Sequence, residues 1–279
     1  MSRFPALGLS VLAGAGFLTS GCGGNDEAAP PAVIPSVMVM ASDFGFQMPD
    51  TLTAGVTSFR LMNHGQEMHH LSLIKLAEGM TMAQFQQMNP AGPIPDGVLF
   101  LGGPNPAAPG GAAEAIVDLA PGRYVAICVI PSPDGQPHIA KGMAKEFVVT
   151  GTAGTATAPS PDVTVKLSDF AFTTAPELRA GRQVIRVENT GSQSHELVFV
   201  KLEPGKGIAD FARWAEHPEG PPPATPMHGV AILGPGQSNT VTVDLVAGDY
   251  GFVCFIPDIT SPERKPHLML GMMQQVKVM

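Results

Sequence analysis

The chain of 279 residues repeats itself at a fixed offset of 126 residues. The residues that return in register are Ser42-Asp43-Phe44 as Ser168-Asp169-Phe170, His69 as His195, Gly122 as Gly248, Tyr124 as Tyr250, and Cys128 as Cys254. Since each unit exceeds 100 residues, it is a duplicated domain rather than one turn of a stacked repeat. We expect one domain at residues 36–150 and another at 162–279. Residues 151–161, which are small, uncharged and tipped with Pro, form the linker.

Short strands separated by turns dominate each copy. Gly and Pro are abundant, at 32 and 28 residues, and only 14% of the chain is charged, a balance that disfavours long helices. The segments that we expect to be strands are 36–41, 57–62, 70–74, 113–119, 124–130 and 145–150, with counterparts at 163–167, 183–188, 196–200, 240–245, 250–256 and 274–278. This spacing predicts an all-β protein of two tandem Greek-key β-sandwiches. One short helical insertion is expected in each copy, at residues 81–88 and 207–217.

The N-terminus has the pattern of an export signal. Arg3 precedes an apolar run at residues 6–18, which is too short to span a bilayer as a mature helix. The run leads into Thr19-Ser20-Gly21-Cys22, which resembles a bacterial lipobox except that Thr19 stands where leucine is usual. We therefore interpret residues 1–22 as a signal peptide with Cys22 as its lipidation site, and 23–35 as a flexible tether. The alternative is an ordinary signal peptide with an incidental Cys.

These features predict an exported lipoprotein, periplasmic or at the cell surface, that is held to a bacterial membrane through its lipid anchor. The net charge of −8 argues against a nucleic-acid partner.

Each copy carries the same ordered set of four metal-ligating residue types. The sets are His69, Cys128, His138 and Met143 in the first copy, and His195, Cys254, His267 and Met272 in the second. The first His precedes the Cys by 59 positions in both sets, and four residues separate the second His from the Met. Only the loop from Cys to the second His differs, with nine intervening residues in one copy and twelve in the other.

Two imidazoles and one thiolate make a trigonal site, and a thioether adds a weak axial contact. Such a set holds copper in both of its oxidation states with little rearrangement. The repeat selects His69 over its neighbour His70, because position 70 aligns with Glu196. Cys128 and Cys254 could instead form one disulfide in an exported protein, but their equivalent positions favour two separate sites.

Three motifs in each copy resemble those of the cupredoxin, or blue copper, family. They are Asn63-His-Gly-Gln-Glu-Met-His69 and Asn189-Thr-Gly-Ser-Gln-Ser-His195 around the first ligand, Gly122-Arg-Tyr-Val-Ala-Ile-Cys128 and Gly248-Asp-Tyr-Gly-Phe-Val-Cys254 before the Cys, and His138-Ile-Ala-Lys-Gly-Met143 and His267-Leu-Met-Leu-Gly-Met272. The resemblance covers almost all of residues 36–279. The departure from the family pattern is a longer loop between Cys and the second His.

The resemblance implies cupredoxin-like sandwiches with two type 1 copper sites that act in electron transfer. Electrons would pass through the exposed edge of His138 or His267. A redox partner such as a c-type cytochrome or a copper enzyme is implied by analogy. Multicopper oxidases and copper nitrite reductases need further histidines, but Ile127 and Val253 precede the cysteines and no His-x-His occurs. We therefore expect no enzyme activity.

Two alternatives to electron transfer remain at this stage. The first is copper storage or delivery, which the long loops and many methionines suggest. Met80, Met82, Met88 and Met227 could form a Cu(I)-collecting face, although packing in a helix core is the simpler interpretation. The second is a metal-free cupredoxin-like scaffold. Of the other histidines, His64 is expected in a surface turn, and His217 and His228 in a solvated Pro-rich loop.

Overall fold

The computed structural model describes residues 1, 32–88 and 92–279. Cys22, the rest of the predicted signal peptide and the tether up to residue 31 lie outside the described residues. No helix in the described part of the chain is long and apolar enough to cross a membrane.

The first copy folds into two facing sheets, as the alternating sequence predicts. The strands are β1 Ser36–Ser42, β2 Gly45–Gln47, β3 Thr51–Thr53, β4 Gly55–Asn63, β5 Ser72–Lys75, β6 Leu99–Phe100, β7 Ala112–Leu119, β8 Gly122–Ile127 and β9 Ala144–Thr150. One sheet has the order β2-β1-β4-β7 and the other β3-β9-β8-β5-β6. In β7 every second side chain is buried, which is the pattern of a strand with one face on the core.

The second copy repeats this arrangement. Its strands are β10 Val163–Ser168, β11 Ala171–Ala175, β12 Gly181–Asn189, β13 His195–Leu202, β14 Ala224–Leu233, β15 Ser238–Leu245, β16 Gly248–Val253 and β17 Met273–Val278. Here the sheets have the orders β11-β10-β12-β15 and β14-β13-β16-β17. Each copy has its own core cluster, one built around Tyr124 and Phe147 and the other around Tyr250 and Phe252.

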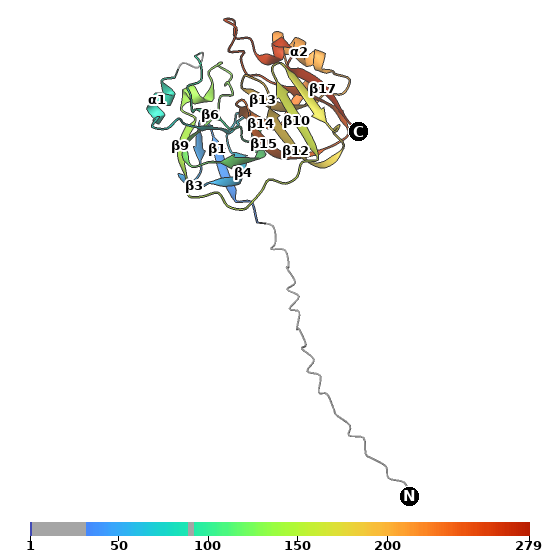
Figure 1. Ribbon diagram of the computed structural model, residues 1–279. Coiled ribbons are helices and arrows are strands. Elements are labelled where there is room, and N and C mark those ends of the chain that lie inside the picture. The colour runs from blue at the N-terminus through green and yellow to red at the C-terminus, as the bar shows by residue number, and fades with distance from the viewer. Residues whose placement is uncertain (2–31, 89–91) are drawn as a thin grey trace. The chain divides into compact units, whose positions relative to one another are not determined.

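The two copies share one sheet of eight strands, because β15 pairs with β7. These two strands are equivalent at the 126-residue offset, and they meet antiparallel with Thr240 opposite Ile116. A second junction joins the segment after β6 to β14 through the bridges Leu101–Leu233 and Pro104–Val230. Figure 1 shows the strands of the two copies in blue to green and in yellow to red.

The two helical insertions lie close to their predicted positions. Helix α1 spans Met82–Gln86 and α2 spans Ile208–Glu216, against predictions of 81–88 and 207–217. Thr81 caps α1, since its hydroxyl accepts from the Gln84 backbone N–H and its own N–H donates to the Gln84 side chain. The amphipathic α2 buries Phe211, and the ring of Trp214 lies 5.7 Å from that of Phe211.

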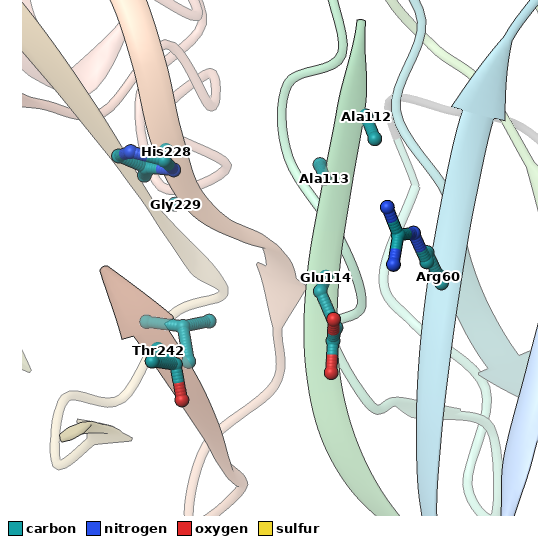
Figure 2. A pocket seen from close by; sticks show the side chains of 8 residues that line it. Arg60, Ala112, Ala113, Glu114, His228, Gly229 and Thr242 are labelled. Atoms are coloured by element: carbon teal, nitrogen blue, oxygen red, sulfur yellow. The ribbon is translucent and has the colours of Figure 1, made fainter. Parts of the chain in front are cut away.

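His228 is not in a solvated loop, as the sequence suggested, but in strand β14, where it is half-buried. The Pro-rich segment ends earlier, because β14 is the edge of its sheet and an edge strand tolerates Pro226. Arg60 and Glu114 face His228 across a hollow of about 200 Å³ where the two copies meet (Figure 2). His64 and His217 are exposed, as expected.

Candidate metal centres

His69, Cys128 and His138 come together inside the first sandwich. The Nδ1 atoms of the two histidines are 3.0 Å apart, and the Cys128 Sγ lies 3.4 Å from Nδ1 of His138. All three side chains are fully buried, with 0% exposure. Their three donor atoms lie within 4.8 Å of one another, so one ion at their centre would reach them all.

His195, Cys254 and His267 form the same cluster in the second sandwich. The two Nδ1 atoms are again 3.0 Å apart, and the Cys254 Sγ is 3.5 Å from Nδ1 of His267. These residues are likewise fully buried. Neither Cys forms a disulfide, and each stands in its own cluster, which excludes the single-bridge alternative.

Met143 and Met272 are fully buried and follow the 3₁₀ helices η1 His138–Lys141 and η2 His267–Leu270. The Cys128 N–H donates to the Met143 carbonyl at 3.3 Å, and Cys254 makes the same bond to Met272. Each Met therefore lies beside its Cys, directly before strand β9 or β17. The sequence pattern did not predict these 3₁₀ turns, which hold the second His and the Met on one loop.

The loop before each first His is shaped by an asparagine. Asn63 donates to the carbonyls of Glu67 and Ala107, and its side-chain oxygen accepts from the Gly65 N–H. Asn189 makes the matching three bonds in the second copy. Because each asparagine side chain makes all three of these bonds, it fixes the loop backbone and so the orientation of the first His in the cluster.

The Nε2–H of each first His donates to an aspartate of the repeated Ser-Asp-Phe motif. Nε2 of His69 lies 2.8 Å from Asp43 Oδ1, and Nε2 of His195 lies 2.9 Å from Asp169 Oδ1. A histidine whose Nε2–H is held by a carboxylate offers an unprotonated Nδ1 to a metal. The motif was visible as a repeat, but its role could be assigned only from the fold.

These aspartates are held in the ionised form. Burial opposes ionisation of Asp43, but the Gln66 N–H, the His69 side chain and the Glu67 N–H lower the pKa of that carboxyl. The pKa of Asp169 is lowered in the same way, against burial, by Ser192 and His195. An anionic carboxylate raises the basicity of the imidazole it contacts and so strengthens a metal–nitrogen bond.

The second histidines differ between the two centres. Nε2 of His138 lies 2.9 Å from Glu67 Oε2, whereas Nε2 of His267 is buried with no hydrogen-bond partner among the described residues. Gln193 stands at the position equivalent to Glu67, and its side-chain oxygen accepts from the Ile259 N–H instead. Glu67 was not singled out from the sequence.

The expectation that His138 and His267 show an exposed edge is wrong, because both are 0% exposed. The ring of Phe44 packs on His138 at 5.0 Å between centroids, and Phe170 packs on His267 at 5.2 Å. Both phenylalanines belong to the repeated Ser-Asp-Phe motif. One layer of side chains thus separates each second His from the surface.

Burial shifts the pKa of several donors toward their neutral form. It raises the pKa of the Cys128 thiol to about 11, and it raises the pKa of Cys254 further. It also lowers the pKa of His69 and His195, and it lowers that of His267 to about 4. Unprotonated imidazoles are ready to bind, but each thiol must lose its proton, so metal binding releases protons.

His70 does not belong to the cluster of His69, Cys128 and His138. It lies beside the sulfur instead. Its backbone N–H donates to Cys128 Sγ at 3.5 Å, and its Nε2 accepts from the Val129 N–H at 3.0 Å. Glu196 makes the same pair of contacts with Cys254 and Phe255, at 3.4 and 3.0 Å. Such contacts to sulfur hold the Cys in place and tune its bond to a metal.

Solved structures that match the chain include copper proteins of one and more domains. Auracyanin from Roseiflexus castenholzii is 24% identical over 42% of this chain and 94% of its own, with a TM-score of 0.28. Auracyanin A, a "blue" copper protein from Chloroflexus aurantiacus, is 20% identical over 41% of this chain and 95% of its own, with a TM-score of 0.26. Copper nitrite reductase from Nitrosomonas europaea is 13% identical over 88% of this chain and 94% of its own, also with a TM-score of 0.26. No family model and no curated protein matches the chain.

The case for metal binding accordingly rests on the donor atoms of the chain itself. Two nitrogens and one sulfur converge in each cluster, and the outer nitrogen of each first His is already held by a carboxylate. This donor chemistry, with a buried Met beside it, fits a type 1 copper ion in each half. The chain thus folds as two tandem β-sandwiches with one such cluster in each, an arrangement that resembles that of cupredoxins.

Proposed function

We propose that this protein carries electrons, with one type 1 copper ion in each domain. The observation that supports this is the convergence of two nitrogens and one sulfur in each cluster, where all three side chains are fully buried. Copper bound there would supply a one-electron couple. The chain supplies ligands that are held from behind by Asp43 and Asp169, so they have little freedom to rearrange.

Electrons would pass through the side chains that cover His138 and His267. Phe44 and Phe170 are the rings in contact with them. We propose a c-type cytochrome or another copper protein as the redox partner. We further propose that the protein is exported and that Cys22 carries a lipid that holds it to a bacterial membrane. Mass analysis of the mature N-terminus, compared with a Cys22→Ala variant that should leave the membrane fraction, tests this anchor.

A visible spectrum of the copper-loaded protein tests the main proposal. Thiolate bound to Cu(II) in such a site should give an intense blue absorption band. Cys128→Ser and Cys254→Ser should each remove about half of it, and the double variant all of it. A copper-loaded protein without this band would contradict the proposal.

Electron self-exchange separates electron transfer from storage. Fast exchange between oxidised and reduced protein is expected if the ligands barely move. Slow exchange with tight Cu(I) binding would favour storage or delivery. Met80, Met82 and Met88 do not favour storage or delivery, because they pack against the hydrophobic cluster around Ile74 and Phe85 rather than forming a Cu(I)-collecting face. We also propose that the protein has no catalytic activity of its own.

A further inference from the structure

Three buried polar side chains lie between the two metal centres without belonging to either donor set. They are His70, Asn105 and Glu196, with exposures of 1%, 2% and 5%. Burying polar groups costs free energy unless they find partners. The contacts of these three residues form a connected path from Cys128 to Cys254.

The two ends of this chain of contacts are alike. His70 donates its backbone N–H to Cys128 Sγ, and Glu196 donates its backbone N–H to Cys254 Sγ. Both side chains then accept from the residue after the Cys, which is Val129 in one copy and Phe255 in the other. Each of the two residues is thus tied both to the sulfur and to the backbone directly after the Cys.

Asn105 joins the two ends across the domain boundary. Its Nδ2 donates to Glu196 Oε2 at 3.1 Å, and its side chain also interacts with the His70 ring. Nε2 of His70 is an acceptor, so Nδ1 carries the proton of the neutral ring. That Nδ1 forms no hydrogen bond of ordinary geometry among the described residues. Asn105 is the polar side chain that acts on the ring.

The second copy has no equivalent bridge within the described part of the chain, because the position equivalent to Asn105 is Ala231. The backbone there is tightly packed. A Cβ on Gly229 would lie 3.0 Å from the Asn105 carbonyl and 1.9 Å from that of Leu197. The segment that carries Asn105 is therefore pressed against β14, and Pro104 bridges to Val230. The amide has little room to move away from Glu196.

We propose that Asn105 is a positioning residue shared by both metal centres, and that it makes metal binding at one centre depend on occupancy of the other. A metal turns the thiol into a thiolate, which accepts a stronger hydrogen bond from the N–H beside it. His70 and Glu196 are each held at both ends, so a shift at one sulfur is passed through Asn105 to the other. A close-packed interior transmits such shifts rather than absorbing them.

Single-site variants measure this dependence. Cys128→Ser leaves only the second centre able to bind copper as a thiolate site. The affinity of that centre for Cu(II), titrated against a competing chelator, is compared with its affinity in the unmodified protein when the first centre is filled. We expect a difference of about fivefold or more, the usual lower range for coupled sites. Asn105→Ala should reduce it to less than twofold.

Asn239→Ala is the matched control. Asn239 is also buried and also joins the two copies, because it accepts from the Gly103 N–H and donates to the Leu101 carbonyl. It touches neither His70 nor Glu196 through any of these bonds. We expect this variant to lose stability and to keep the coupling. If Asn105→Ala does not fold, Asn105→Ser serves in its place.

Amide hydrogen exchange gives a second readout that needs no redox activity. In the Cys254→Ser protein only the first centre fills, yet the Phe255 amide should change its exchange rate when Cu(II) is added. The change should vanish in Asn105→Ala and persist in Asn239→Ala.

The inference requires both metal sites but not electron transfer. Affinities that agree within twofold whether the other centre is filled or blocked would overturn it and leave the metal sites standing. Failure of both single-site variants to bind copper would instead overturn the proposed function, and the inference with it.

Discussion

Glu67 Oε2 lies 2.9 Å from Nε2 of His138, and the His138 hydrogen bond is the main cause that lowers the pKa of the Glu67 carboxyl. The second centre has Gln193 at that position, and its second His has no such partner. An ionised carboxylate on a ligand favours the more positive state of the metal. The two centres, alike in donors, are therefore expected to differ in reduction potential, with the first centre lower.

Glu67→Gln should raise the reduction potential of the first centre, because it removes the negative charge and keeps the side-chain shape. Spectroelectrochemical titration in the Cys254→Ser background isolates that centre. Gln193→Glu in the Cys128→Ser background is the reverse change and should lower the potential of the second centre. Shifts in the same direction for both variants would contradict the charge argument.

Gly191→Ala should weaken metal binding at the second centre about 10- to 100-fold, which is typical for loss of an outer partner. A Cβ at Gly191 would lie 2.4 Å from Asp169 Oδ1 and 2.8 Å from Nε2 of His195, so the carboxylate must move. Metal titration of each centre checks this, with the first centre as internal reference. Gly154→Ala, where the added Cβ meets nothing within 4 Å, should leave both centres unchanged.

The metal-free protein should lose stability as the pH falls below about 6.5. Burial lowers the pKa of His70 to about 3, so the unfolded chain takes up a proton that the folded chain refuses. Between these two pKa values the group costs about 1.4 kcal/mol per pH unit. Urea unfolding at pH 7, 6 and 5 measures the slope, which His70→Gln should reduce. An unchanged slope would mean that His70 is charged in the folded state.

Glu196 occupies the equivalent position and should act with the opposite sign. Burial raises its pKa to about 7, so the folded protein keeps a proton that the unfolded chain has lost above about 4.5. Its contribution to stability is present at low pH and is lost as the pH rises through 7. Because this contribution opposes that of His70, Glu196→Gln should make stability fall more steeply as the pH is lowered from 7 to 5 in the same unfolding series.

Tyr124→Phe and Tyr250→Phe should each lower the free energy of unfolding by about 1 kcal/mol, the usual net value of one hydrogen bond. Their hydroxyls donate to the carbonyls of Ala120 and Val246, at 2.6 and 3.0 Å, and so tie the turn to the strand that ends in the Cys. Thermal unfolding measures the loss. The absorption band should keep its position, since neither hydroxyl contacts a ligand.

The donor residues could be predicted because the repeat supplied a second copy of every position. That comparison favoured His69 over His70 as a ligand, and it favoured two separate sites over a disulfide between the two cysteines. The strands that were predicted followed from their alternation, since a face on the core leaves a period of two in the sequence. Strands β2, β3, β6, β11 and β14 were not predicted. In β14 the reason is Pro226, which is compatible only with an edge strand, and an edge is defined by the whole sheet rather than by the segment.

The surroundings of the donors could not be predicted, because they come from chain segments that only the fold brings together. Asp43 is 26 positions from His69, and Glu67 is 71 from His138. Asn105 reaches a residue of the other domain 91 positions away. The cover over His138 was missed for the same reason, since Phe44 arrives from a distant turn.

The junction between the copies has a consequence for how such a chain could arise. Thr240 pairs with Ile116, and exchanging the copies at the 126-residue offset maps this register onto itself; the bridge between Pro104 and Val230 behaves likewise. A contact with that property is the kind that joins two identical subunits about a two-fold axis. The protein is thus organised as a homodimer fused into one chain. After fusion the two halves can differ in sequence. Asn105 in one half and Ala231 at the equivalent position of the other are such a difference, which two identical subunits could not have.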